Sequence, residues 1–188
     1  MVGAPLHSMP QRYGAFAMVL HWVIALLLVG SFSIGLYMVG LKFSPQKLTL
    51  YSYHKWIGVT VFSLAVLRLL WRLSHRAPDL PASMPKWQVA ASHASHALLY
   101  LFLIATPLSG WLYSSAAGVP TVPFGIAALQ LPDLLDKDRE LAALLKFTHM
   151  AINYSFGALI CLHVAAALKH LLIDRDGIMT RMLPGKTP

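Results

Sequence analysis

The stretch that decides the fold is LLKFTHMAINYSFGALICLHVAAALKHLLI, which covers residues 144–173. It carries only two charged residues, Lys146 and Lys169, and both lie near its ends. An apolar helix of about 20 residues crosses the hydrocarbon core of a bilayer. The stretch is therefore predicted to be a membrane-spanning helix with polar ends.

Three further apolar blocks precede it, at residues 14–40, 53–73 and 92–117. Together the four blocks predict an all-α fold, an integral membrane four-helix bundle that forms one domain over residues 1–188. The first block could instead be a signal peptide, because Arg12 precedes it. Its apolar region, however, is longer than the 7–15 residues typical of such signals, so we expect it to remain as a helix.

The composition supports a membrane protein and argues against nucleic acid as a partner. Of the 188 residues, 57% are hydrophobic and 12% are charged, whereas soluble domains carry roughly 25% charged residues. The net charge of +8 comes from basic residues placed between the apolar blocks, without a dense basic run. Such charges orient a chain in the lipid bilayer and contact anionic lipid. Cys161 is the only cysteine, which excludes an intrachain disulfide and a Cys-x-x-Cys-His site for covalent haem.

The charges of the loops predict the orientation. Residues 71–88 hold three basic residues against one acidic residue, and residues 118–145 hold four acidic against two basic. Positively charged loops stay in the cytoplasm, so the first segment is expected inside and the second outside. Both termini are then cytoplasmic. The short loop with Lys42 and Lys47 is a mild exception.

Histidines carry the strongest functional signal. His149 and His163 are 14 residues apart, which is about 40° short of four helical turns and about 21 Å along the axis. The two histidines therefore lie on one face of the helix, at two different depths in the membrane. His54 lies near the outer end of the second block and His21 near the inner end of the first, so the depths match in pairs.

Neutral imidazole is a common metal ligand, and ionisable residues at membrane depth are usually functional. We therefore expect His54 with His149 to hold an outer haem iron, and His21 with His163 an inner one. In the alternative interpretations, the histidines are only hydrogen-bonded helix contacts, or His96 replaces His21 at the inner iron.

Other polar residues lie close to these positions. Arg68 is 14 residues after His54, where its guanidinium could bind a haem propionate or extend to the inner interface. His93, His96 and His170 are expected at the inner end, either as a quinone-binding and proton-donating group or as interfacial residues in contact with water.

Several stretches together resemble a known family. These are residues 16–27 with the His21–Trp22 pair, residues 54–72, HASHALLYLFLIATPLSG at 93–110, and LHVAAALKH at 162–170 followed by RMLP. The combination resembles the bacterial cytochrome b561 family over nearly the whole chain. The resemblance implies a four-helix inner-membrane protein with two non-covalent b haems, held by His21, His54, His149 and His163. It also implies a relationship to the cytochrome b subunits of nickel-iron hydrogenases and formate dehydrogenases.

Members of this family are similar to a superoxide oxidase that oxidises superoxide at the periplasmic side and reduces ubiquinone near the cytoplasmic side. The haems would supply the redox chemistry, so no protein nucleophile or base is needed. Positive charge at Lys42, Lys47 and Lys55 would steer the anionic radical toward the outer haem. Protons for the quinone would come from the cytoplasm through groups such as His96 or His170.

Two other functions are compatible with the sequence. The chain could be the haem-b membrane-anchor subunit of a larger dehydrogenase or hydrogenase, with a periplasmic protein as electron donor docked on residues 118–145. The same loop could instead cap the outer haem. A more remote alternative is a transporter or structural bundle without a cofactor, in which the histidines relay protons or pack helices.

Overall fold

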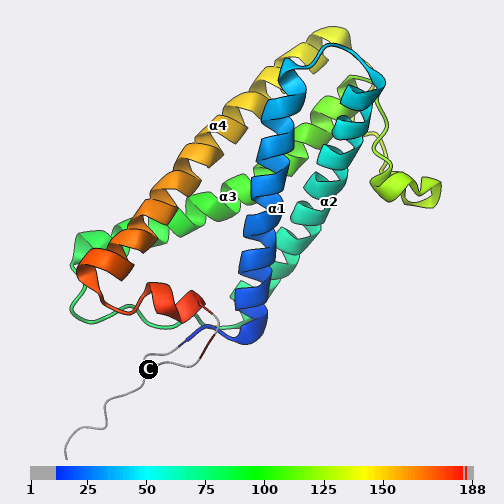
Figure 1. Ribbon diagram of the computed structural model, residues 1–188. Coiled ribbons are helices and arrows are strands. Elements are labelled where there is room, and N and C mark those ends of the chain that lie inside the picture. The colour runs from blue at the N-terminus through cyan, green and yellow to red at the C-terminus, as the bar shows by residue number, and fades with distance from the viewer. Residues whose placement is uncertain (1–11, 184, 186–188) are drawn as a thin grey trace, which may run out of the picture.

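The computed structural model describes residues 12–183 and 185, and over these residues the protein is a bundle of four long helices (Figure 1). The helices are α1 (Ala15–Gly40), α2 (Pro45–Ser74), α3 (Lys86–Ala116) and α4 (Arg139–Lys169). Short helical turns are η1 (Pro123–Gly125), η2 (Ala127–Leu129), η3 (His170–Asp174) and η4 (Met179–Met182). The described residues include no strand, which confirms the all-α prediction.

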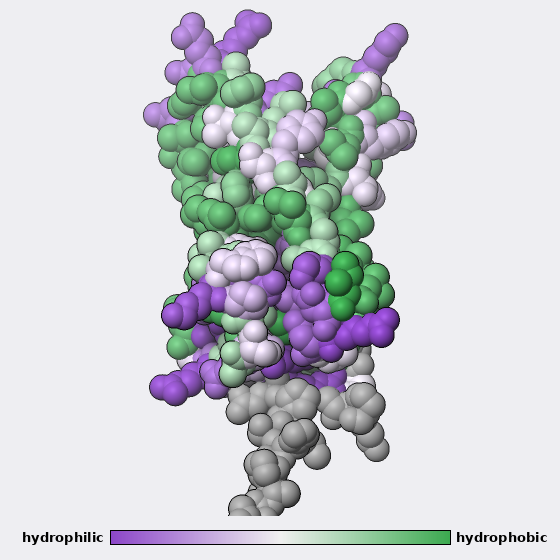
Figure 2. Space-filling model, turned by 90° about the vertical axis from the view of Figure 1, so that its left-hand side faces the viewer, coloured by the Kyte–Doolittle hydropathy of each residue, from purple (hydrophilic) through white to green (hydrophobic). Residues whose placement is uncertain are grey.

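Each of the four helices is long and apolar enough to cross a membrane. Large hydrophobic side chains cover their outer surfaces, and Leu26 of α1 is 71% exposed. Hydrophobic residues gather over the middle of the face in Figure 2, and hydrophilic residues gather toward both ends. A surface of this kind is suited to lipid. The predicted four-helix membrane bundle is confirmed.

Capping residues place the helix starts outside the apolar blocks. α2 begins at Pro45 because the Ser44 hydroxyl accepts a hydrogen bond from the Lys47 amide and proline suits the first helical position. α4 begins at Arg139 because the Asp138 carboxylate accepts from the amides of Glu140 and Leu141. Apolar content marks where a chain crosses lipid, whereas caps mark where its helix starts.

Aromatic packing fills the centre of the bundle. Phe156 of α4 is 2% exposed, stacks on Phe102 of α3 at a centroid separation of 5.8 Å, and lies 6.3 Å from the ring of Phe32 of α1. Phe156 is also seven residues from both His149 and His163. A packed apolar layer therefore separates the two ends of the molecule.

Both ends of the described chain lie at the same end of the bundle, below the foot of α1 in Figure 1. The Tyr13 amide donates to the Arg181 carbonyl at 3.3 Å, and the Trp22 indole donates to the Met182 carbonyl at 2.8 Å. We call this the inner end, and the end with the loop between α3 and α4 the outer end. That the inner end faces the cytoplasm stays a prediction.

Candidate functional site

Two histidines face each other at the outer end of the bundle. The rings of His54 from α2 and His149 from α4 have centroids 6.3 Å apart and an interplanar angle of 82°. A metal bound by one nitrogen of each imidazole, at about 2.0 Å from each, would place the ring centroids about 6.3 Å apart. The spacing of this pair therefore suits a single metal ion between the two rings.

The hydrogen bonds of His54 determine which of its nitrogens can bind a metal. Its Nδ1 lies 3.1 Å from the backbone carbonyl oxygen of Ser31 and 3.2 Å from the Ser31 hydroxyl. A carbonyl oxygen only accepts, so Nδ1 carries the proton in this contact and the neutral ring keeps a bare Nε2. Metal-binding histidines commonly donate their second N–H to a carbonyl in this way.

A serine hydroxyl holds His149 in the same tautomer. Its Nδ1 lies 2.8 Å from the hydroxyl oxygen of Ser109, and that hydroxyl donates its hydrogen to the Thr106 carbonyl at 2.7 Å. The Ser109 oxygen must then accept from Nδ1–H, which leaves Nε2 of His149 bare. Both histidines of the outer pair thus present an unprotonated Nε2.

Glycines make room for the two outer rings. A Cβ atom on Gly110 would lie 3.0 Å from Cε1 of His149, and one on Gly35 would lie 3.3 Å from Cε1 of His54. Both distances are shorter than ordinary van der Waals contact. A side chain at either position would press on the imidazole, so the glycines preserve the ring positions.

A second group of histidines lies at the inner end. The ring centroid of His163 from α4 is 6.4 Å from that of His21 on α1 and 5.7 Å from that of His96 on α3. The His96 Nδ1 donates to the Ser92 carbonyl of its own helix at 2.8 Å. Both candidate partners of His163 are therefore close to it, and the 6.4 Å separation to His21 is nearer the value for a shared metal.

Arg68 of α2 lies beside this inner group. Its guanidinium donates to the Ala17 carbonyl of α1 at 2.8 Å, one helical turn before His21. One N–H group is used in this contact, and the guanidinium has further donors. A role in binding a propionate stays a prediction.

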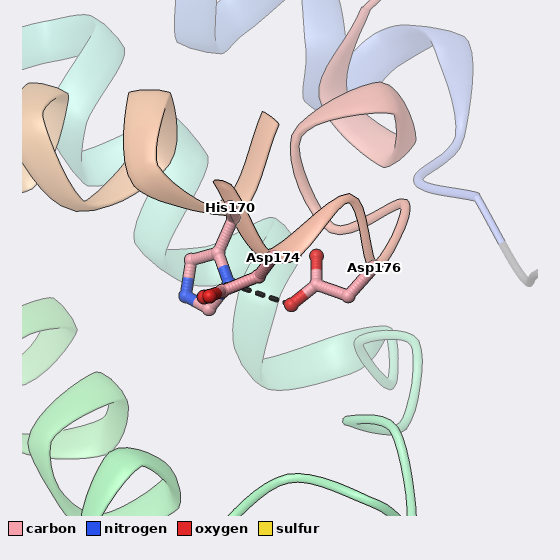
Figure 3. Close-up of side chains that lie close together, drawn as sticks. All are labelled: His170, Asp174 and Asp176. Carbon is pink, nitrogen blue, oxygen red and sulfur yellow. Dashed lines mark hydrogen bonds and ion pairs between the residues drawn. The ribbon is translucent and has the colours of Figure 1, made fainter. Parts of the chain in front are cut away.

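His170 forms a separate cluster with two acidic residues just beyond α4 (Figure 3). Its Nδ1 lies 2.6 Å from a carboxylate oxygen of Asp176 and 3.3 Å from one of Asp174, and Asp174 also pairs with the Lys169 ammonium. The ligand atoms of the three residues lie within 4.8 Å of one another, although Lys169 already partly neutralises the cluster. His93 is exposed on α3. The expected quinone or proton role of His93, His96 and His170 stays a prediction.

Basic residues lie at the outer end, but two of the three expected there contact backbone carbonyls. The Lys47 ammonium donates to the Leu41 carbonyl at 2.6 Å, and that of Lys55 donates to the carbonyls of Val119 and Pro120. Carbonyls leave the positive charge in place. Through its two contacts, Lys55 also holds the loop after α3.

A basic pocket that was not predicted from the sequence lies at the outer ends of α3 and α4. This pocket of about 300 Å³ is lined by Tyr113, Ala116, Ala117, Lys137, Arg139, Ala142, Ala143 and Lys146. Among the described residues, no carboxylate lies within 4.0 Å of any of its three cationic groups. Lys146 is one helical turn from His149, so the positive charge lies close to the outer histidine pair.

Comparison with known proteins identifies the family. The family model described as prokaryotic cytochrome b561 matches residues 12–185. The chain belongs to the prokaryotic cytochrome b561 family. Cytochrome b561 homolog 2 of Escherichia coli (strain K12) is 35% identical over 182 residues, which cover 93% of this chain and 92% of that protein.

Two further relatives are more distant. The probable superoxide oxidase CybB of Yersinia pestis is 26% identical, over 95% of this chain and 99% of that protein. Cytochrome b561 homolog 1 of Escherichia coli (strain K12) is 27% identical, over 93% of this chain and 98% of that protein.

Membership of the cytochrome b561 family makes this chain a multi-pass bacterial membrane cytochrome that transfers electrons and binds haem b. The residues present fit that cofactor. Two imidazoles with bare Nε2 atoms face each other at a metal-bridging distance, and glycines leave space beside both rings. The outer histidine pair thus has the donor set that an iron held by two imidazoles requires.

The supporting residues Ser31 and Ser109 were not found from the sequence. A serine in an apolar block is also common as a helix contact, so the residue type alone carries little information. The one sequence feature that could have indicated this support is the pair Ser109–Gly110, in which a hydrogen-bonding residue is next to a residue without a side chain. A Cβ on Gly35 would press on the His54 ring, whereas a Cβ on Gly30 or Gly58 would meet nothing within 4 Å.

Proposed function

We propose that this cytochrome binds two b haems, with His54 and His149 on the outer iron and His21 and His163 on the inner one. It would oxidise superoxide at the periplasmic face of the bacterial inner membrane and reduce ubiquinone near the cytoplasmic face. Two superoxide anions lose one electron each and become dioxygen, and ubiquinone gains two electrons and two protons to become ubiquinol. The observation that carries the proposal is the pair of bare Nε2 atoms on His54 and His149, with ring centroids 6.3 Å apart.

Haem b supplies one-electron redox chemistry when it is bound. The protein's own part is to orient the ligands and exclude water. The Ser31 carbonyl and the Ser109 hydroxyl hold the Nδ1 protons of His54 and His149 away from the metal position. The packed ring of Phe156 keeps the layer between the two histidine groups apolar.

Positive charge at the outer end supports an anionic electron donor. Lys55, Lys137, Arg139 and Lys146 all lie there, and Lys146 is one turn from His149. Clustered positive charge raises the local concentration of an anion and its association rate. The name of the Yersinia pestis relative, a probable superoxide oxidase, agrees with superoxide as that anion.

Titratable groups at the inner end support proton delivery to a quinone. The exposed His96 lies against His163, and the His170 Nδ1 is in hydrogen-bond contact with the Asp176 carboxylate. The side chains of His170 and Asp176 are partly exposed at the inner end, so they can exchange protons with the solvent there. These contacts support the proposal that His96 and His170 deliver protons to a quinone at the inner end.

The ligand assignment is tested by counting haems. Haem per polypeptide is measured by the pyridine haemochrome assay in the wild type and in His54→Ala, His149→Ala and His163→Ala. We expect two haems in the wild type and about one in each variant. Two haems in both His54→Ala and His149→Ala would contradict the outer pairing.

The substrates are tested separately by stopped-flow spectroscopy. The oxidised protein is mixed with superoxide, with and without a short-chain ubiquinone, while the haem α band is followed. Reduction by superoxide, followed by reoxidation only with quinone, is expected. A protein that dithionite reduces and superoxide does not would instead favour the subunit of a larger dehydrogenase.

A further inference from the structure

An uncharged segment follows α3 and exposes apolar side chains. Residues 118–132, GVPTVPFGIAALQLP, contain no charged residue. Phe124 is 57% exposed, Ile126 48% and Leu129 49%. The Leu131 amide donates to the Thr121 carbonyl at 2.9 Å and closes the segment into a hairpin that contains η1 and η2. We call residues 119–132 the outer hairpin.

The outer hairpin lies beside α2 and does not cover the end of the bundle. In Figure 1 it projects sideways, next to the outer part of α2. The Lys55 ammonium donates to the Val119 and Pro120 carbonyls, and the Trp56 indole donates to the Val122 carbonyl at 2.8 Å. This position favours a lateral role for the hairpin over the expected alternative of a loop that caps the outer haem.

Contact with Trp56 orients the tip of the hairpin. The rings of Phe124 and Trp56 have centroids 5.9 Å apart. Phe124 has a φ of 55°, in the left-handed region that side chains other than glycine rarely adopt. The following apolar side chains, Ile126 and Leu129, remain exposed on the side of the bundle.

The depth of the hairpin is set by its attachment to α2. Residues 56–67 of α2 carry no charge, and Lys55 directly precedes them. Tryptophan and lysine are the residue types that mark the boundary between hydrocarbon and headgroups. The hairpin is thus fastened to α2 where the apolar part of that helix begins.

We propose that the outer hairpin is an interfacial membrane anchor, which places Phe124, Ile126 and Leu129 among the lipids of the outer leaflet. An uncharged, apolar segment held laterally at the membrane boundary buries its side chains in lipid without a further partner. The charged segment that follows, from Asp133 to Glu140, then remains in the aqueous phase. This inference rests on the bundle and its loop, and is independent of the substrates proposed above.

A single labelled cysteine tests the inference in the full-length protein. Cys161 is the only cysteine, so Cys161→Ser gives a background into which Ile126→Cys is introduced, with Asp136→Cys as the matched control in the same loop. Each protein is labelled with the fluorophore NBD and placed in phosphatidylcholine nanodiscs with or without a 5-doxyl lipid. Only preparations that keep the haem α band are used, and Leu129→Cys provides a second hairpin site.

Quenching then decides the environment of the hairpin. The anchor predicts that doxyl lipid quenches the label at 126 at least twofold more than the label at 136, and that aqueous iodide shows the reverse order. Equal iodide quenching at the two sites would overturn the proposal and make the hairpin available to a protein partner. A label at 126 that neither quencher reaches would also overturn it, because the hairpin would then pack against protein.

Discussion

The hydroxyl oxygen of Ser109 lies 2.8 Å from Nδ1 of His149, and its own hydrogen is used on the Thr106 carbonyl. Because the Ser109 hydroxyl donates its hydrogen to Thr106, the Nδ1–H of His149 is the donor in the contact between His149 and Ser109. It holds His149 in the tautomer whose Nε2 is free to bind iron. Ser109 thus determines which nitrogen of His149 carries the proton.

Ser109→Ala should weaken haem binding at the outer position. The Nδ1–H of His149 loses its acceptor, and loss of such a supporting partner typically lowers metal affinity about 10- to 100-fold. The measurement is haem transfer from the purified protein to excess apomyoglobin. Ser63→Ala is the control, because the Ser63 hydroxyl only donates to the Val59 carbonyl of its own helix. Equal haem loss from the two variants would contradict the positioning role.

Gly110→Ala should displace the His149 ring. The new Cβ would lie 3.0 Å from Cε1 of His149, whereas the Cβ of Gly58→Ala would meet nothing within 4 Å. We expect a haem content close to one per chain in Gly110→Ala and a wild-type value in Gly58→Ala. Full occupancy in Gly110→Ala would show that α3 can shift away from the ring at little cost.

The inner ligand can be identified by comparing His21→Ala with His96→Ala. His163 lies near both rings, but the separation from His21 is closer to that of a shared metal. His21→Ala should remove one haem. His96→Ala should keep both and slow quinone reduction by the dithionite-reduced protein. Loss of a haem in His96→Ala alone would assign the inner iron to His96 and His163.

Lys146→Ala should slow the reaction with superoxide and make it less sensitive to salt. Lys146 contributes one of the three cationic groups of the outer pocket, and attraction of an anion weakens as ionic strength rises. The second-order rate constant is measured by stopped flow between 20 and 300 mM salt, which spans Debye lengths from about 20 to 6 Å. Lys169→Ala, at the inner end, is the charge-matched control. Parallel salt dependences in the wild type and Lys146→Ala would argue against steering by this pocket.

Phe156→Ala should destabilise the bundle by about 3 kcal/mol, because truncation of a buried aromatic ring leaves a cavity. Phe147→Ala removes the same atoms from a side chain that is 70% exposed on the same helix, and should change the free energy of unfolding much less. Unfolding in mixed micelles with increasing SDS gives both values. Similar losses in the two variants would mean that the Phe156 site closes around the missing ring.

The long-range pairing of the histidines was predictable from the sequence because helical geometry is regular. A separation of 14 residues placed His149 and His163 on one face, and the apolar blocks gave the depths of His54 and His21. The structure brings the rings of each expected pair within 6.4 Å between centroids. Their role as iron ligands stays a prediction.

Local contacts were less predictable. The start of α2 at Pro45 depends on the Ser44 cap, which hydropathy does not detect. The support of His149 by Ser109 depends on the rotation of α3 against α4, which no spacing within one helix reveals. The path of the outer hairpin depends on hydrogen bonds from Lys55 and Trp56 to carbonyl groups, and any residue type supplies a carbonyl.

The apolar layer around Phe156 separates the two histidine groups in a membrane that carries an electrical potential. If an electron crosses this layer between the two histidine groups without a proton, it carries charge across about 21 Å of the membrane, roughly two-thirds of its hydrocarbon core. A membrane potential of 100 mV then changes the free energy of that transfer by about 1.6 kcal/mol. With the proposed orientation the cytoplasm is the negative side, so the resting potential would oppose each inward transfer.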